Sequence, residues 1–182
     1  MKNPLRLLLA TLAVCLSGCG SPSVESYANR TPKLDLREYF KGDFTAFGAF
    51  FDLAGDPNTR FAIKLNGIWD GNKGILKETF TYDDGKVQQR EWHMTFTDDN
   101  NFTATASDVV GVAIGKQYGN AVHITYTLQV PRGDSTMNMQ MDDWLYRIDE
   151  TTVINRNVMR KFGLKVGELV IGFNGPQPQK IR

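Results

Sequence analysis

Alternation of apolar and polar residues constrains the fold of this chain more than any other feature. In residues 121–130, AVHITYTLQV, every second side chain from Val122 to Val130 is apolar, and those between them are mostly polar. A period of two is that of a β-strand with one face in a core and the other toward solvent. The same period recurs in three further runs, at residues 61–69, 92–96 and 137–141. The chain is therefore expected to be all-β.

Short segments rich in Asp, Asn and Gly separate these runs, at residues 70–72, 83–85, 98–101 and 132–134. Such residues tolerate the positive φ that tight hairpin turns need. Many short strands joined by tight turns are typical of a β-sandwich or of an up-and-down barrel. We expect a single antiparallel up-and-down barrel of about 8–10 strands, lipocalin- or calycin-like, because closure leaves no sheet edge exposed. The one helix we expect is short, at residues 36–40.

The first residues have the layout of a lipoprotein signal peptide. Two basic residues, Lys2 and Arg6, precede an apolar run at residues 7–16 that is too short to span a bilayer. The tetrapeptide LSGC at residues 16–19 resembles a bacterial lipobox. In that resemblance residues 1–18 are cleaved, and Cys19 carries a diacylglycerol and an N-acyl chain that attach the protein to a membrane. Gly20 in place of an aspartate favours the inner leaflet of the outer membrane, with the protein facing the periplasm.

The rest of the chain divides into three parts. We expect a lipidated N-terminus and flexible tether at residues 19–33, a barrel domain at residues 34–175 and a C-terminal tail at residues 176–182. Cleavage would leave 19 basic and 20 acidic residues without a basic patch, so no nucleic-acid partner is indicated. The membrane is the partner we expect, through the lipid. The sequence identifies no protein partner.

A glycine-rich stretch at residues 107–120, SDVVGVAIGKQYGN, raises the question of a nucleotide site. A phosphate-binding loop needs four residues between its glycines, a hydroxyl residue after the lysine, and a helix to follow. Only three residues separate Gly111 from Gly115, Gln117 follows Lys116, and the next residues alternate as a strand. These glycines are expected to bend or connect strands. We expect no nucleotide, no metal and no other cofactor, since His93 and His123 lack a ligand spacing.

Charged residues fall on apolar faces in two of the alternating runs. If residues 83–85 form a three-residue loop with Gly85 left-handed, Glu78 lies directly opposite Arg90. A matching odd-length loop before the next strand would bring Asp108 beside or near Arg90, as an inward cluster. A loop of two or four residues would shift the register and separate them. Two interpretations stay open, because a guanidinium can hold two carboxylates in a core. The cluster is either a buried salt bridge that fixes register or a polar anchor at one end of an apolar cavity.

Five blocks of the sequence together resemble a known family. They are LDLREYFKGDFTAFGAF, GIWDGNKGILKETFTYDDG, SDVVGVAIGKQYGNAV, MDDWLYRID and KFGLKVGELVIGF. The chain resembles the bacterial lipoprotein family catalogued as domain of unknown function 3833. The resemblance implies a periplasm-facing lipoprotein with a lipocalin-like β fold. It implies no established activity and no catalytic residues.

Three functions are compatible with such a chain. The first is binding of an apolar ligand, such as a fatty acid or lipid, inside the barrel. The residues expected to form this site are Glu78, Arg90 as head-group anchor, Trp92, Met94, Asp108, Tyr126, Met139 and Trp144. The second is a structural or interaction role in the cell envelope, with a filled barrel and an exposed apolar patch. The third is hydrolysis of a lipid or glycan by an inward carboxylate, which we expect less than binding.

Overall fold

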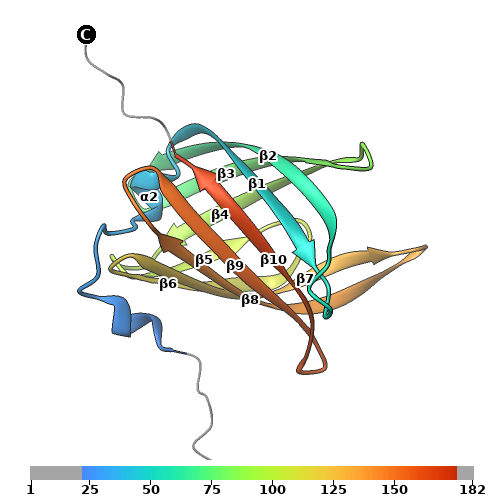
Figure 1. Ribbon diagram of the computed structural model, residues 1–182. Coiled ribbons are helices and arrows are strands. Elements are labelled where there is room, and N and C mark those ends of the chain that lie inside the picture. Colours follow the sequence, from blue (N-terminus) through green and yellow to red (C-terminus); the bar gives the residue numbers. More distant parts are fainter. Residues whose placement is uncertain (1–21, 176–182) are drawn as a thin grey trace, which may run out of the picture.

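The computed structural model describes residues 22–175; the expected signal peptide, Cys19 and the tail from residue 176 lie outside these residues. Ten antiparallel strands form a closed barrel in which each strand pairs with its neighbours in the chain and the last pairs with the first (Figure 1). The strands are β1 (Gly42–Phe51), β2 (Pro57–Asp70), β3 (Lys73–Tyr82), β4 (Val87–Phe96), β5 (Asn101–Thr105), β6 (Val109–Tyr118), β7 (Ala121–Arg132), β8 (Ser135–Arg147), β9 (Thr152–Lys161) and β10 (Leu164–Asn174). The predicted up-and-down barrel is confirmed.

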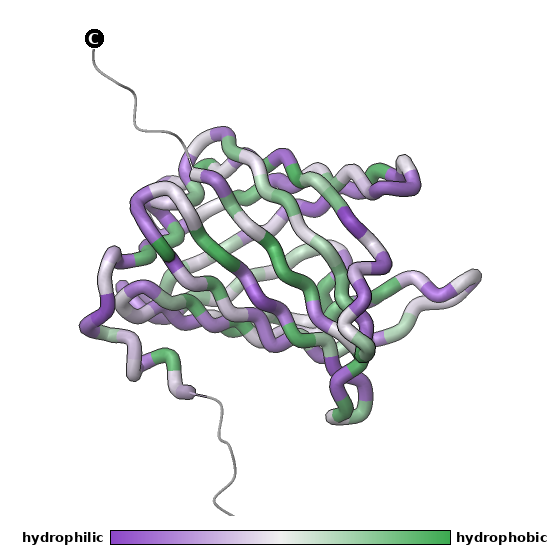
Figure 2. Tube along the Cα trace, in the orientation of Figure 1, coloured by the Kyte–Doolittle hydropathy of each residue, from purple (hydrophilic) through white to green (hydrophobic). Residues whose placement is uncertain are grey.

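Alternation places one face of each strand inside the barrel. In β2, Phe61, Ile63 and Leu65 are buried, whereas Lys64 between them is exposed. Figure 2 shows hydrophobic and hydrophilic residues following one another along the strands. Most inward apolar side chains form one cluster, and Met139, Met141 and Met159 form a second. Their burial is the main source of stability that the sequence offers.

The turn between β3 and β4 sets the register of the charged residues. The Tyr82 amide donates to the Lys86 carbonyl over 2.9 Å, and Gly85 has φ of 84°. The loop therefore contains three residues and ends in a left-handed glycine, as predicted. Glu78 consequently lies opposite Arg90 across the β3–β4 ladder.

The short helix α2 (Leu36–Tyr39) closes one end of the barrel. Asp35 caps it by accepting a hydrogen bond from the Arg37 amide. The carbonyl of Phe40 accepts a hydrogen bond of 3.0 Å from the Trp69 indole. A side chain on Gly67 would meet that same carbonyl oxygen at 1.6 Å, so this position requires glycine. The helix therefore packs against the end of the barrel wall.

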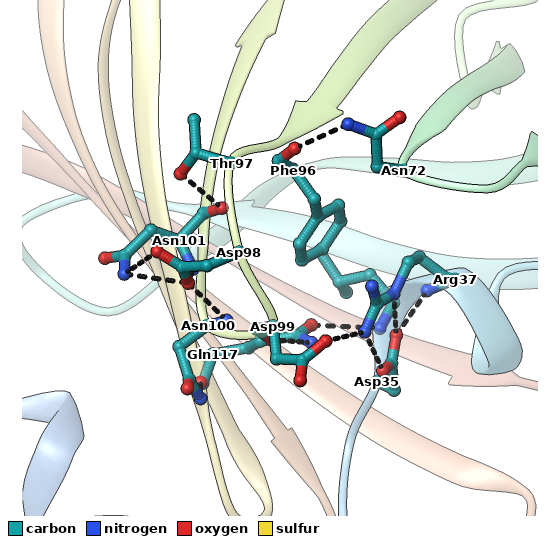
Figure 3. Close-up of polar contacts among 11 residues, drawn as sticks. Asp35, Arg37, Asn72, Phe96, Thr97, Asp98, Asp99, Asn100, Asn101 and Gln117 are labelled. Atoms are coloured by element: carbon teal, nitrogen blue, oxygen red, sulfur yellow. Dashed lines mark hydrogen bonds and ion pairs between the residues drawn. The ribbon is translucent and has the colours of Figure 1, made fainter.

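Gln117, from the glycine-rich stretch, ties this helix to the barrel. Its side chain is buried, accepts from the Leu36 amide at 3.1 Å and donates to the Asp99 carbonyl at 2.9 Å. Figure 3 shows Gln117 and Asp99 beside the Arg37–Asp35 ion pair of the helix. Gly111 lies where the pairing of β6 with β7 shifts register. The stretch is therefore structural, as predicted.

From residue 22 onward, the segment before α2 differs from the flexible tether that we expected over residues 19–33. A 3₁₀ helix, η2 (Val24–Tyr27), packs on the outside of the barrel. Val24 is buried there against Ala121 and Trp144, and the Tyr27 ring lies 6.1 Å from that of Trp144. The segment packs against the barrel because Val24 and Tyr27, three residues apart in a polar stretch, cover aromatic surface that would otherwise face water.

Candidate functional site: a cavity with buried carboxyl groups

The interior of the barrel contains a cavity of about 380 Å³. Leu36 and Phe40 close it at the α2 end. At the opposite end the lining includes the exposed residues Gln129 and Pro131, so the cavity opens there. The walls between are mostly aromatic and aliphatic. They include Phe61, Ile63, Trp69, Leu76, Trp92, Met94, Ile124, Leu145 and Ile171.

Three of the five expected wall residues line the cavity: Trp92, Met94 and Tyr126. Met139 does not line it, although it is buried inside the barrel in a cluster with Met141 and Met159, both of which do. Its expected role as a wall residue is therefore wrong in detail.

Trp144 was expected to be a wall residue, and the structure corrects this. Asp143 and Leu145, its neighbours on β8, line the cavity, so Trp144 faces the outside of the barrel by the alternation of the strand. There it stacks on His123, with 4.2 Å between ring centroids, and covers Val24. The tryptophan anchors η2 instead of contacting a ligand.

The predicted cluster of Glu78, Arg90 and Asp108 forms inside the cavity. Arg90 donates from Nη2 to Asp108 over 2.7 Å and from Nε over 3.0 Å. Its Nη1 atom lies 3.8 Å from Glu78 Oε2, which is an ion-pair distance but too long for a hydrogen bond. The guanidinium is also 5.9 Å from the centre of the Trp92 ring. Asp108 is thus the main partner of Arg90, and Glu78 is the weaker one.

A second polar group lies on β7, β8 and β9. Asn155 donates from Nδ2 to Asp143, and the Tyr126 hydroxyl is 3.5 Å from the same carboxyl. Asn157 donates to the Tyr126 hydroxyl over 2.9 Å. The two asparagines are not among the site residues predicted from the sequence. The signal was the alternation of β9, which puts both on the inward face together with Met159.

Two carboxyl groups in the cavity have strongly shifted pKa values. Burial raises the pKa of Glu78 to about 7, against the lowering effect of the Arg90 charge. Burial also raises the pKa of Asp143 to about 7, against the hydrogen bonds from Asn155 and Tyr126. Burial by itself lowers the pKa of Arg90, but Glu78 and Asp108 reverse this and raise it, so the guanidinium stays charged. Both carboxyl groups therefore change charge near neutral pH.

Two acceptor atoms of the cavity lack a hydrogen-bond partner among the described residues. They are Glu78 Oε2 and Asn157 Oδ1, and both residues are at least nine-tenths buried. A buried acceptor without a partner is unfavourable, and native proteins usually satisfy it with water or a ligand. The two atoms are therefore free to take hydrogen bonds from a molecule in the cavity.

Two other features bear on function, namely metal-binding groups and membrane-spanning helices. Among residues 22–175, no group of three or more His, Cys, Asp or Glu side chains could hold a metal ion. Within the same residues, the helices are too short or too polar for any of them to cross a membrane.

Comparisons with known proteins identify a family and a related fold. A family model described as "Protein of unknown function (DUF3833)" matches residues 13–175. The solved structure of an S-type phycobiliprotein lyase from Guillardia theta has a TM-score of 0.55 and 9% sequence identity, over 87% of this chain and 100% of that chain. This likeness concerns the fold, and it agrees with the lipocalin-like barrel predicted from the sequence. No curated protein matches the chain.

Proposed function

The chain belongs to the protein family of unknown function DUF3833, and we propose that it binds a small lipid-like molecule inside its barrel. The observation that carries this proposal is the open, mostly apolar cavity of about 380 Å³. Ligand sites of this kind measure about 300–1,000 Å³ and combine apolar walls with a few polar groups. The deep end, near Phe40 and Leu76, suits a hydrocarbon chain. Because the interior is not filled by its own side chains, the alternative of a solid structural barrel loses its main support.

A cavity-blocking substitution tests the binding function. We expect Ala104→Phe to weaken binding of copurifying lipid at least about tenfold, because Ala104 lines the cavity and a ring there occupies its space. Since residues 22–175 contain the whole closed barrel, a chain of residues 20–182 exported to the periplasm is suitable. Extraction and mass spectrometry of the purified chain then identify and count bound molecules.

The matched control for this test is Thr105→Phe, which adds the same ring on the next residue of the chain, where the side chain is exposed on the outer face. It should leave the bound lipid unchanged. An empty wild-type chain that is folded, or equal loss of lipid in both variants, would contradict binding in the cavity.

We further propose that the barrel is attached to the inner leaflet of the outer membrane through Cys19 and faces the periplasm. The lipobox-like sequence supports this, and so does the course of the chain after it. Only four residues separate Cys19 from Val24, which is buried against the barrel wall. A lipid on Cys19 would therefore hold the barrel close to the membrane surface.

Cys19→Ser should abolish incorporation of labelled fatty acid and release the protein from the membrane fraction, because the thiol is the proposed lipid attachment point. Cys15→Ser is the control, since Cys15 lies within the proposed signal peptide and should not affect lipidation. Labelling of the Cys19→Ser protein at the wild-type level would contradict the proposal. The measurement is radiolabelled palmitate incorporation together with membrane fractionation.

One observation favours a second candidate function, hydrolysis of a lipid or glycan. Asp143 has a pKa raised to about 7 in the cavity and is not within ion-pair distance of Arg90, which suits a general acid or base. Prolonged incubation of the purified chain with its copurifying lipid distinguishes the two functions. Intact lipid indicates binding, and cleaved products that disappear in Asp143→Asn indicate an enzyme.

A further inference from the structure

The charged residues that line the cavity do not balance. They are three carboxyl residues, Glu78, Asp108 and Asp143, and one cation, Arg90. Asp108 already occupies the Nε and Nη2 atoms of Arg90. The remaining Nη1 atom faces Glu78 at 3.8 Å. A negatively charged head group entering here would find no unpaired cation and would meet two further carboxyl groups.

The fully buried unpartnered atoms of the cavity have the same polarity, although Arg90 Nη1 also makes no hydrogen bond. Glu78 Oε2 and Asn157 Oδ1 are both acceptors, and both are buried without a partner among the described residues. The amide nitrogens of Asn155 and Asn157 already donate to Asp143 and Tyr126. These two buried atoms therefore offer acceptors to a ligand that donates hydrogen bonds.

We propose that the polar end of the ligand is a hydrogen-bond donor without negative charge, for which a primary ammonium is the best fit and a hydroxyl the next. This inference rests on the proposed binding function. It changes the role of Arg90 from the expected head-group anchor to the partner that holds Asp108. The head group contacts Glu78 and Asn157, while the hydrocarbon chain lies toward Phe40. Hydrogen bonds between an ammonium and a carboxylate are charge-assisted and so among the stronger ones.

The affinity for an amine is then expected to depend on pH. The titratable groups that face the cavity are Glu78 and Tyr82 from β3, Arg90 from β4, Asp108 before β6, Tyr126 from β7 and Asp143 from β8. Burial raises the pKa of both Glu78 and Asp143 to about 7. An alkylamine stays protonated from pH 6 to pH 8, whereas these two carboxyl groups lose their protons over this interval. Its affinity should therefore rise with pH.

Three ligands of equal chain length test the proposal: dodecylamine, dodecanol and dodecanoate. Each is titrated below its solubility limit or micelle concentration into the exported chain of residues 20–182, and the heat of binding is measured. At pH 8 we expect the amine to bind at least about tenfold more tightly than the carboxylate, with the alcohol between them. From pH 6 to pH 8 the affinity for the amine should rise about tenfold or more.

Glu78→Gln should remove most of the preference for the amine at pH 8 and leave the binding of dodecanol within about twofold. The control is Glu38→Gln, which removes an exposed carboxyl group on α2 and should change nothing. Carboxylate binding equal to or tighter than amine binding at pH 8 overturns the inference but not the binding function. Failure of all three ligands to bind a folded chain overturns the binding function itself. Thermal unfolding of each variant shows that it is folded.

Discussion

Arg90→Met should lower the free energy of unfolding by about 3–5 kcal/mol at pH 8. Arg90 is the only cation among the side chains of residues 22–175 that line the cavity. Without it, Asp108 loses three hydrogen-bond contacts, and Glu78 loses the charge that lowers its pKa. Breaking a buried ion pair from one side is costly because the remaining charges stay uncompensated in a medium of low dielectric constant. Methionine replaces the apolar stem of the arginine side chain and removes the guanidinium charge.

The loss should be smaller at pH 5 than at pH 8. A carboxyl group whose pKa is higher in the folded than in the unfolded protein destabilises the fold as pH rises above the unfolded value. Removing Arg90 raises the folded pKa of Glu78 further, so the destabilisation grows toward pH 8. Urea unfolding at both pH values measures the effect.

Arg60→Met is the control for this prediction. The Arg60 side chain is 72% exposed and pairs with Asp83 over 3.2 Å on the surface. Such exposed pairs contribute less than about 1 kcal/mol. A loss from Arg90→Met no larger than that from Arg60→Met would show that the interior cluster does not depend on its cation.

Much of the fold and part of the site follow from local sequence. Alternation identifies the strands, and the Asp83–Gly85 turn fixes the register that brings Glu78 opposite Arg90. Register is predictable here because a single turn type determines it and because a shift of one residue would expose an entire apolar face.

Other features of the site depend on how distant segments pack. Alternation on β8, carried from Met141 through Asp143, would have excluded Trp144 from the cavity, but nothing local shows that η2 covers its outer face. The cavity volume is likewise a collective property. It depends on how the rings of Phe61 and Trp69 lie along the wall, against Gly48 and Gly74. A pattern of apolar residues predicts an apolar interior but does not distinguish a hollow barrel from a filled one.

The interior carboxyl groups lower the stability of the fold, but they also offer a means of binding a ligand. Folded proteins usually pair buried charges fully, yet Glu78 and Asp143 exceed what Arg90 can neutralise. Groups with such perturbed pKa values concentrate at functional sites. A ligand that donates hydrogen bonds or positive charge would relieve this imbalance, and its binding would then stabilise the fold.

Glu78→Gln should therefore stabilise the protein at pH 8, by about 3 kcal/mol relative to the wild type. This change in the free energy of unfolding is opposite in sign to the change expected for Arg90→Met, although the two residues face each other. The pKa of Glu78 is about 7 in the folded protein and 4.5 ordinarily. Between pH 4.5 and pH 7 the Glu78 carboxyl group binds its proton more tightly in the folded than in the unfolded state, so wild-type stability falls as pH rises toward 7. Glutamine does not ionise, and Arg90 retains Asp108 as its partner.

The gain should shrink to less than about 1 kcal/mol at pH 5, where the folded wild-type carboxyl group is already protonated. Urea unfolding of wild type, Glu78→Gln and the exposed control Glu38→Gln at pH 5 and pH 8 measures it. The control should show no comparable change between the two pH values. Destabilisation by Glu78→Gln at pH 8 would mean that Glu78 is a net stabilising partner of Arg90. The cavity would then lack the excess of carboxyl groups on which the preference for a donating head group depends.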